Sequence, residues 1–584
     1  MALEIGLTHT SALIVEEQHL AANVGSGDLR VLATPMMMAL MENAAMLAVA
    51  PELEDGQSTV GGQISASHLK PTGLGQEVKA TAELVKVDGR KLTFRVTASD
   101  EEGVIGEGEH LRFIVGREKF MSKVTNKLRQ LIVLLSLALS LATATRSLAY
   151  DAPIQAHHDS ILALISGAQH IDAQPVKSIT AFGAKGDGRK DCRPAFDKAM
   201  RTATRNAKGL HLVVPAGEWF VKGPLHLTSN LTLELQEGAH LLFSPEPTDY
   251  LPVVETSWEG SFCYNLSPMI YGHGLKNVAI VGKGTIDGNC PETFPLWRKE
   301  QKPAQQRLRA QDHSEAPVAE RVYGVEDKLR PHLLQLYECE DVTIEGVKIT
   351  NSPFWCVHLL KCQNVICRSL HYDAKLVNND GIDPEMTRNV LIEDIDFDNG
   401  DDNVAIKAGR DNDGWKGTPS ENIIIRNCRF KGLHGLVIGS EMSAGVRNVF
   451  VEDCTVGGYC KRALYIKSNP NRGGFVHDIY FQNCHFDEVE DMFYITSMYA
   501  GEGQDDNHFT HIHDIHVDNV SARKVRNAAI VLQGTQALPI YNVSFKDFTV
   551  EEAKVGFSSM NTLDVQLRNC NIGGRVDGAP SQAK

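Results

Sequence analysis

Four short polar phrases in the second half of the chain carry side chains suited to acid–base chemistry. The phrases are Asn378-Asn379-Asp380-Gly381-Ile382-Asp383, Gly400-Asp401-Asp402, Gly432-Leu433-His434-Gly435 and Tyr465-Ile466-Lys467. Carboxylates that lie close together repel one another, which raises the pKa of at least one of them and suits it to act as a general acid. The phrases therefore predict a hydrolytic site built on aspartates. The alternative is that the aspartates only cap turns, and we interpret Asp383 in that structural sense.

A repeat surrounds these phrases from about Ser178 to the end of the chain. Its unit is an Asn or Asp followed by alternating apolar residues, with copies beginning at Asp341, Asn364, Asn389, Asn422, Asn448, Asp478, Asp514 and Asn542. The spacing is roughly 22 to 36 residues, which is typical of solenoid coils. Each unit predicts a short strand, with the Asn in a tight left-handed turn. We expect a right-handed parallel β-helix in which Asp380 and Asp401 lie side by side on coils about 4.8 Å apart.

Three further features fit a solenoid. Asp191 to Ala207 predicts an amphipathic helix that caps the open first coil, and Trp297 to Val325 breaks the repeat as an inserted loop. All 12 cysteines lie at or after Cys192. Four of them share one position in the repeat, namely Cys428, Cys454, Cys484 and Cys570. That recurrence favours a ladder of small apolar side chains over the alternative of a disulfide framework.

The acidic phrases resemble the polygalacturonases, the pectin hydrolases of glycoside hydrolase family 28. The resemblance also includes Phe182-Gly-Ala-Lys-Gly-Asp-Gly, Val214-Pro-Ala-Gly and Gly284-Thr-Ile-Asp-Gly, in the same order. It implies an inverting hydrolase of α-linked galacturonate in pectic polysaccharides or oligosaccharides, without metal or cofactor. In that family Asp401 would be the general acid, and Asp380 and Asp402 would hold the attacking water. By the same resemblance, His434 would orient the acid, and Lys467 and Asn378 would contact the substrate.

One departure from the family bears on the substrate. Tyr465 stands where the family has an arginine, so a bidentate partner of the substrate carboxylate is missing. Tyr465 could instead stack on a sugar ring, and rhamnogalacturonan-type specificity stays open. Two other functions also stay open. The aspartates could bind calcium in a pectate lyase, or the solenoid could bind carbohydrate without catalysis.

Residues 1–118 have a different pattern, a long apolar helix followed by alternating strands. Thr34 is expected to cap a helix that begins at Pro35, and strands are expected at 61–68, 76–87, 91–99 and 104–115. One helix against several antiparallel strands predicts a small α+β domain with a hot-dog fold.

This first segment resembles the fluoroacetyl-CoA-type thioesterases. The matching phrases are Gly25-Ser26-Gly27, Ala33-Thr34-Pro35, Met41-Glu42, Ser67-His68-Leu69 and Val87-Asp88-Gly89-Arg90. The resemblance implies Thr34, Glu42 and His68 as the catalytic set, an acyl-CoA substrate and a domain that can dimerise. A carboxylate, a histidine and a hydroxyl are suitable groups for thioester hydrolysis. Such an activity is the alternative function of the chain.

Between the two segments, residues 121–149 have the form of a secretory signal peptide. A basic start precedes an apolar run at 131–144, which is short for a membrane span, and small residues follow at 147–149. We expect domains at 1–118 and 178–584, with the signal-like segment and a linker at 119–177. The hydrolase is then secreted or periplasmic, whereas the first domain has a cytoplasmic character. The net charge of −15 argues against nucleic acid as a partner.

Overall fold

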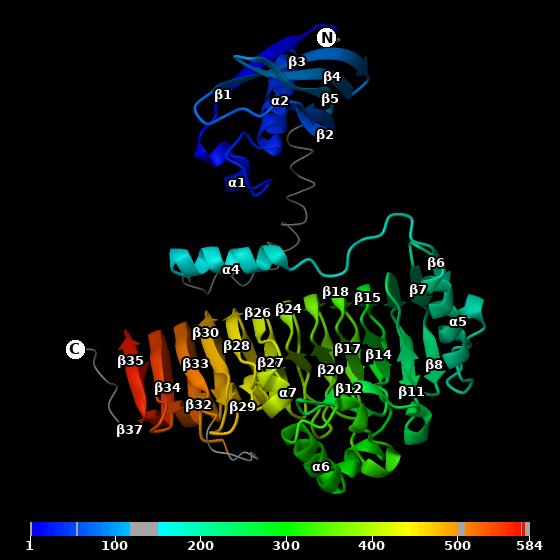
Figure 1. Cartoon of the computed structure of the whole chain (residues 1–584), viewed down its shortest axis with the longest axis vertical. Coiled ribbons are helices and arrows are strands. Elements are labelled where there is room, and N and C mark those ends of the chain that lie inside the picture. Colours follow the sequence, from blue (N-terminus) through cyan, green and yellow to red (C-terminus); the bar gives the residue numbers. More distant parts are fainter. Residues whose placement is uncertain (1–2, 54–55, 117–149, 500–507, 574, 578–584) are drawn as a thin grey trace. The chain divides into compact units, whose positions relative to one another are not determined.

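The computed structural model describes residues 3–53, 56–116, 150–499, 508–573 and 575–577 (Figure 1). It divides into two compact units, residues 1–146 and 147–584. The signal-like segment at 121–149 lies outside the described residues, so its interpretation stays a prediction. In the part of the chain that the structure describes, no helix combines the length and the apolar character needed to cross a membrane.

The first unit is one antiparallel sheet packed against one long helix. The helix is α2 (Thr34–Val49), and the strands are β1 (Thr8–Ile14), β2 (Gln57–His68), β3 (Glu77–Asp88), β4 (Lys91–Asp100) and β5 (Gly103–Gly116), in the order β1-β3-β4-β5-β2. Short helices lie at η1 (Glu17–His19), α1 (Ala21–Val24) and η2 (Ala50–Glu52). The inward residues of the strands and one face of α2 form a single buried core. The predicted hot-dog fold is confirmed.

One detail of the first unit differs from the prediction. Thr34 is the first residue of α2 rather than its N-cap, and Ala33 takes the cap position without a side-chain hydrogen bond. The hydroxyl of Thr34 is engaged elsewhere, because it lies 2.9 Å from Nδ1 of His68 on β2. The hydroxyl of Thr34 therefore contacts His68 rather than the helix end.

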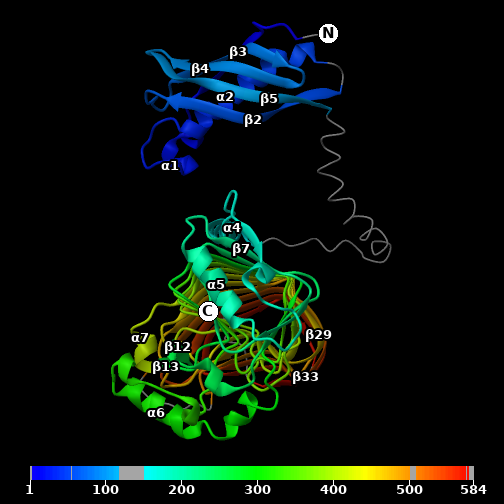
Figure 2. The ribbon, with the colours of Figure 1, turned by 90° about the vertical axis from the view of Figure 1, so that its right-hand side faces the viewer.

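The second unit is a parallel β-helix, seen from the side in Figure 1 and from its end in Figure 2. Its strands stack in three columns. The first column is β6 (Val176–Ser178), β7 (Leu210–Val214), β10 (Leu231–Leu235), β15 (Lys276–Gly282), β18 (Glu340–Glu345), β21 (Gln363–Arg368), β24 (Arg388–Glu393), β26 (Ser420–Arg426), β28 (Val446–Glu452), β30 (Phe475–Gln482) and β35 (Thr562–Arg568). The second column is β9 (Leu225–His226), β14 (Ile270–His273), β17 (Leu334–Tyr337), β20 (Val357–Leu360), β23 (Ile382–Glu385), β25 (Asp402–Ile406), β27 (Arg429–Gly439), β29 (Thr455–Lys467), β32 (Asp491–Thr496) and β37 (Arg575–Asp577).

The third column is shorter. It consists of β8 (Gly217–Val221), β11 (Ala239–Phe243), β16 (Thr285–Asp287), β19 (Lys348–Thr350), β22 (His371–Asp373), β31 (His485–Val489) and β36 (Asn571–Ile572). β27 and β29 begin in this column and continue into the second, while β33 (His511–Gln533) and β34 (Ile540–Met560) run through all three. Apolar side chains from every column fill one continuous core.

An asparagine ladder fixes the backbone at the start of β21, β24, β26 and β28 in the first column. Asn364, Asn389, Asn422 and Asn448 all have positive φ, between 55° and 59°. The side-chain amide of each later member donates to the Oδ1 of the one before it, at 3.0 to 3.1 Å. The predicted left-handed turns and their stacking are confirmed.

The cysteines line the core. All twelve lie in the described part of the chain, and none forms a disulfide. Cys428, Cys454 and Cys484 are buried at the same place in successive coils, and the backbone amide of Cys454 donates to Sγ of Cys484 at 3.4 Å. The predicted ladder of small side chains is present, with Cys570 at its partly exposed end.

Two helices cover the solenoid. α5 (Arg193–Thr204) lies across its N-terminal end, as predicted for the cap, and the short η3 (Ile179–Phe182) precedes it (Figure 2). α4 (Ala152–Leu164) lies along the coils, where Ile161 packs with Leu391 and Ile424 of the first column. Residues 150–177, predicted as linker, therefore include a helix that belongs to the second unit.

The predicted loop at 297–325 contains a helix of its own. The insertion includes η5 (Phe294–Lys299), α6 (Lys302–His313), η6 (Val318–Glu320) and η7 (Val325–Asp327). Together with η4 (Pro247–Tyr250) and the hairpin of β12 (Val254–Trp258) and β13 (Ser261–Asn265), it forms the side lobe below the coils in Figure 1. Its buried aromatic and aliphatic residues make a small second core.

Candidate active site

The aspartates meet at the start of consecutive strands of the second column. β23 and β25 pair with Ile382 opposite Val404, so Asp380, which precedes β23, lies beside Asp402. β25 and β27 pair with Asp402 opposite His434. All three polar side chains are buried. The register sets Asp380 opposite Asp402 rather than opposite the expected Asp401, and the roles of these residues in a reaction stay predictions.

Asp402 is held between a lysine and a histidine. Nζ of Lys467 lies 3.1 Å from Oδ2 of Asp402, and Nδ1 of His434 lies 2.5 Å from Oδ1. Burial opposes ionisation of Asp402, but the charge of Lys467 and the contact with His434 outweigh it and hold the pKa of Asp402 well below its usual value. Burial lowers the pKa of His434, against the attraction of Asp402.

The pKa of Asp401 is shifted in the opposite direction from that of Asp402. Burial, followed by the negative charge of Asp402, raises the pKa of Asp401 to about 7. The amide of Asn378 donates to Asp401 at 3.2 Å, and Arg330 fixes Asn378 by donating to its Oδ1 at 2.8 Å. A carboxylic acid that keeps its proton near neutral pH therefore lies next to an ionised carboxylate. This is the split that acid–base catalysis requires.

Lys407 is a buried cation that we did not single out from the sequence. Its Nζ lies 3.4 Å from Glu441, 3.7 Å from Asp383 and 3.9 Å from Asp380. Burial, followed by the charge of Asp383, raises the pKa of Asp380. Asp383 is completely buried beside Lys407 and lies within β23, so it does not cap a turn as expected. The available signal was a lysine directly after the apolar run Val404-Ala405-Ile406.

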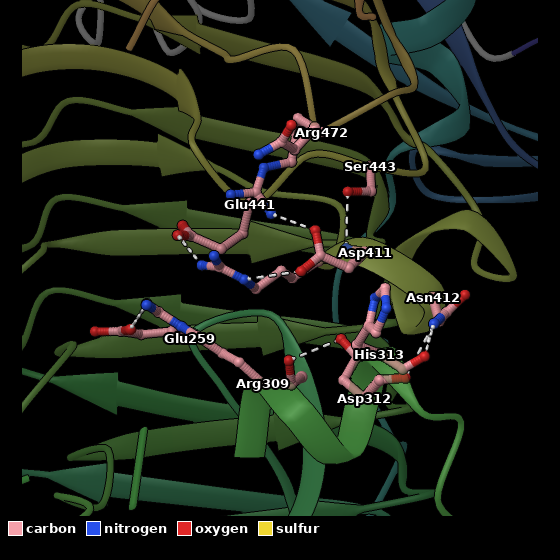
Figure 3. A network of polar contacts seen from close by, with 12 residues as sticks. Glu259, Arg309, Asp312, His313, Asp411, Asn412, Glu441, Ser443 and Arg472 are labelled. Atoms are coloured by element: carbon pink, nitrogen blue, oxygen red, sulfur yellow. Dashed lines mark hydrogen bonds and ion pairs between the residues drawn. The ribbon is translucent and has the colours of Figure 1, made fainter. Parts of the chain in front are cut away.

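The insertion is attached to the segment that follows β25. Figure 3 shows Arg309 of α6 paired with Glu259 of the hairpin tip at 2.9 Å. In the same view Asn412 of α7 (Asp411–Trp415) donates to the backbone oxygens of α6, at 3.0 Å to Asp312 and 2.9 Å to His313. Since α7 follows β25 by only a few residues, these contacts fasten the insertion to the coil that carries the aspartates.

A second network joins the same region to later coils. Arg472 pairs with Asp411 at 3.2 Å, and the backbone amide of Asp411 donates to Ser443 at 3.0 Å (Figure 3). Glu441 pairs with Lys407. Burial opposes the ionisation of Glu441, but the charges of Lys407 and Arg472 hold its pKa low. These buried charges are all paired, as their burial requires.

In the first unit, two of the three predicted residues come together. Thr34 and His68 are hydrogen-bonded at 2.9 Å and line a pocket of about 340 Å³. Glu42 is not in this pair. Its carboxylate lies 3.5 Å from Nε2 of His110, a fully buried histidine that also contacts Arg112 at 3.1 Å. Burial lowers the pKa of His110. His110 and Arg112 are polar residues within strand β5 that the sequence analysis missed.

Comparison with known proteins identifies the larger unit. A sequence model described as glycosyl hydrolases family 28 matches residues 210–570, more than half of the chain. The chain belongs to glycosyl hydrolases family 28. A model described as rhamnogalacturonase A/epimerase, pectate lyase-like, matches residues 176–234 at its start.

Family 28 relatives share most of this unit. A "Probable polygalacturonase" of Vitis vinifera is 30% identical over 64% of this chain and 74% of its own length. The exo-poly-alpha-D-galacturonosidase of Dickeya chrysanthemi is 28% identical over 69% of this chain and 72% of its own length. The solved structure of a hyperthermoactive exopolygalacturonase from Thermotoga maritima is 34% identical, with a TM-score of 0.66, and the match covers 72% of this chain and 96% of that one.

The first unit matches a second family. A model described as fluoroacetyl-CoA-specific thioesterase covers residues 15–118. The match contains Thr34, Glu42 and His68 and ends just beyond β5. The family 28 hydrolase is therefore preceded by a thioesterase-type domain.

Tyr465, the departure from the family 28 pattern, lies in the floor of the site. The residue is 6% exposed and packs with Ala405 and Val437 of neighbouring coils. The guanidinium carbon of Arg462 lies 4.3 Å from the centre of its ring. The ring is thus covered by a cation of its own strand, so this structure does not offer it to a sugar. Arg462 is a residue that sequence reasoning missed.

The family 28 site also contains a cluster with the spacing of metal ligands. Donor atoms of Asp401, Asp402 and His434 lie within 4.8 Å of one another. Both oxygens of Asp402 already have partners in the protein, because Lys467 contacts Oδ2 and His434 contacts Oδ1. The donor set therefore fits a proton-transfer site with an internal lysine better than a calcium site, which takes six or more oxygens.

Proposed function

We propose that the second unit hydrolyses α-linked galacturonate in pectic polysaccharide or oligosaccharide, with Asp401 as the general acid. The observation that carries the assignment is that the pKa values of the adjacent residues Asp401 and Asp402 are shifted in opposite directions. Asp402 meets Lys467 at 3.1 Å and stays ionised, whereas the pKa of Asp401 is raised to about 7. Asp402, with Asp380 beside it, activates a water that attacks the sugar from the opposite face and inverts the anomeric centre.

The substrate class rests on the names of the relatives and on the charge of the site. The relatives are called polygalacturonases, and their substrate carries a carboxylate on every sugar. Lys467 is a cation in the site that can attract such a chain. Rhamnogalacturonan is the alternative substrate. Rates on oligogalacturonate and on rhamnogalacturonan oligosaccharides distinguish the two.

We infer that cleavage starts from a chain end. Gln335 and His358 point outward from the second column on the N-terminal side of the aspartates, yet both are fully buried. The hairpin covers them, with Thr256 donating to Gln335 at 2.8 Å. A polysaccharide cannot continue over strands that are covered in this way. Release of short products without an early fall in pectin viscosity supports the inference, and a rapid fall in viscosity contradicts it.

The decisive experiment for the acid is the substitution Asp401→Asn. It removes the proton donor without changing the volume of the side chain, so hydrolysis should fall by about 10²- to 10⁴-fold. Asp396→Asn is a matched control, because Asp396 is an exposed aspartate of the same coil, paired with Arg429. Retention of activity within about tenfold of the parent would show that another group is the acid. NMR of the first product should show the inverted anomer.

A second function is favoured by the pocket of the first unit. We propose that Thr34 and His68 hydrolyse an acyl-CoA thioester there, because they are paired at 2.9 Å and both line the pocket. Glu42, next to His110, is the group that would complete the set. Release of free CoA from acetyl-CoA and fluoroacetyl-CoA should be lost in His68→Ala and kept in His9→Ala. The pectinolytic rate should be the same in both variants.

Two properties of the whole chain are also proposed. The hydrolase unit is exported, since residues 121–149 have the composition of a signal peptide. The first unit forms a dimer, supported by the exposed apolar side chains of Leu69 and Phe113 near the open edge strand β2. Light scattering of the full chain measures the second property.

A further inference from the structure

The row of polar side chains that contains Asp402 and His434 continues for two more coils. β27 and β29 pair with His434 opposite Arg462, and β29 and β32 pair with Arg462 opposite Asp491. The side chain of Arg462 is 16% exposed and that of Asp491 is 2% exposed. Two charged residues are thus kept inside the site without a part in the chemistry proposed above.

In the hydrogen bond between Arg462 and His434, only Arg462 can be the donor. Nη1 of Arg462 lies 3.4 Å from Nε2 of His434. A guanidinium has only donors and does not lose its proton in proteins, so Nε2 must be the acceptor. A neutral imidazole then carries its proton on Nδ1, where it faces Oδ1 of Asp402 at 2.5 Å. Asp402 and Arg462 together therefore keep the proton on Nδ1, and Arg462 opposes a second proton on Nε2.

Arg462 is itself held in place from two sides. Its Nε lies 3.4 Å from Oδ2 of Asp491, and its guanidinium carbon lies 4.3 Å from the ring centre of Tyr465 and 4.4 Å from that of Tyr494. Asp491 is fixed in turn, because its Oδ1 accepts from the side chain of Asn527 at 2.8 Å and from the backbone of Ala528 at 3.2 Å. The arginine is thereby clamped over the aromatic floor.

We propose that Arg462, anchored by Asp491, is a positioning residue of the hydrolase that keeps His434 neutral with its proton on Nδ1. The proposal rests on the roles proposed for Asp401 and Asp402. His434 faces Asp402 on β25 and Lys467 and Arg462 on β29, with the Tyr465 ring 5.3 Å away. Without Arg462, Nε2 is free to take a second proton. A positive His434 would attract negative charge to both aspartates, so Asp401 would lose its proton at a lower pH.

The experiment is the pH dependence of kcat for the full chain carrying Arg462→Met, measured on an oligogalacturonate. The limb at which activity falls with rising pH should move to lower pH by about one unit. Activity at pH 7 should fall by about fivefold, with KM within about twofold of the parent. Arg462→Lys keeps the positive charge and should shift the limb less. Arg523→Met is the matched control, because Arg523 is an exposed arginine of the solenoid, paired with Asp487.

Two results would overturn the proposal. An unshifted limb, whatever the loss of kcat, means that Arg462 is merely structural. A raised KM with an unchanged kcat means that Arg462 binds the substrate carboxylate instead. Should Arg462→Met fail to fold, Asp491→Asn loosens the same arginine and should shift the limb in the same direction.

A measurement without substrate tests the role of Arg462 independently of the assignment of Asp401 as the general acid. NMR of the full chain labelled with ¹⁵N-histidine reports the tautomer of His434, which is identified by its absence in His434→Gln. The parent should show the Nδ1–H form, and Arg462→Met should lose it in the neutral range. If the tautomer changes as expected while Asp401→Asn stays active, the assignment of Asp401 fails and the link between Arg462 and His434 stands.

Discussion

Lys467 and Asp402 form an ion pair at 3.1 Å although two coils of the solenoid separate them. The preceding residue, Asp401, accepts instead from the uncharged amide of Asn378 at 3.2 Å. Two carboxylates adjacent in the chain thus meet different partners, because successive residues leave the strand in different directions. Their pKa values are separated in consequence.

The pH dependence of hydrolysis follows from this separation. Activity should fall as the pH rises through about 7, where Asp401 loses its proton. The pKa of Asp402 is depressed, so loss of its charge should limit the rate only in strongly acidic solution. Initial rates of reducing-end release across the pH range check this. In Asp401→Asn, an aryl galacturonide with a good leaving group should be cleaved without the alkaline limb, and a persistent limb would point to another acid.

Tyr465→Arg should harm the enzyme rather than restore the family pattern. A new guanidinium at this position would share a buried floor with Arg462 and Lys467, and the Tyr465 ring now separates and covers these cations. Unpaired buried charges are costly, so we expect a lower melting temperature and a lower kcat. Tyr465→Phe is the control, since it keeps the ring and should leave both values near those of the parent. A gain in affinity for oligogalacturonate in Tyr465→Arg would refute this view of the floor.

The contact between the insertion and α7 should weaken as the pH rises from acidic values to about 7. Burial, followed by the charge of Asp413, raises the pKa of Asp312 to about 7. A carboxyl group with a raised folded-state pKa stabilises the protein fully below its unfolded pKa, and this contribution is lost as the pH rises through about 7. Asp312→Asn cannot ionise, so its melting temperature should change less between about pH 5 and about pH 8. Asp197→Asn, on the exposed side of α5, should follow the parent. Parallel curves for the parent and Asp312→Asn would argue against an ionising Asp312.

Export should remove everything before Tyr150. The described part of the second unit begins at Tyr150, whose ring packs against Phe450 and Tyr480 at 5.5 and 6.1 Å. A product expressed from Met121 in a Gram-negative host should reach the periplasm and begin at or near Tyr150. N-terminal sequencing of the exported protein checks this. An extracellular protein that keeps residues 1–120 would show that the two units are exported together.

The fold was predictable from sequence because the coils repeat the same sequence pattern, an asparagine turn followed by alternating apolar residues. The aspartate cluster was predictable for the same reason. Contacts that depend on the register between coils were not. Arg462 and Lys407 reach the site only through strand pairing, and Arg462 covers Tyr465 from three positions earlier in its own strand. Local helix signals likewise predicted an N-cap at Thr34, whereas its hydroxyl pairs with His68, 34 residues further along the chain.

The asparagine ladder has a consequence for how this protein can change. Its members are separated by 25, 33 and 26 residues, yet their amide-to-amide distances stay between 3.0 and 3.1 Å. Coil length is therefore independent of the pitch of the stack, because one corner sets the rise and the other corners absorb the extra residues. Added segments at those corners can reshape the groove while the ladder remains unaltered. Such a scaffold can acquire a new wall around its reactive groups by insertion alone, and the lobe that carries α6 is one such addition.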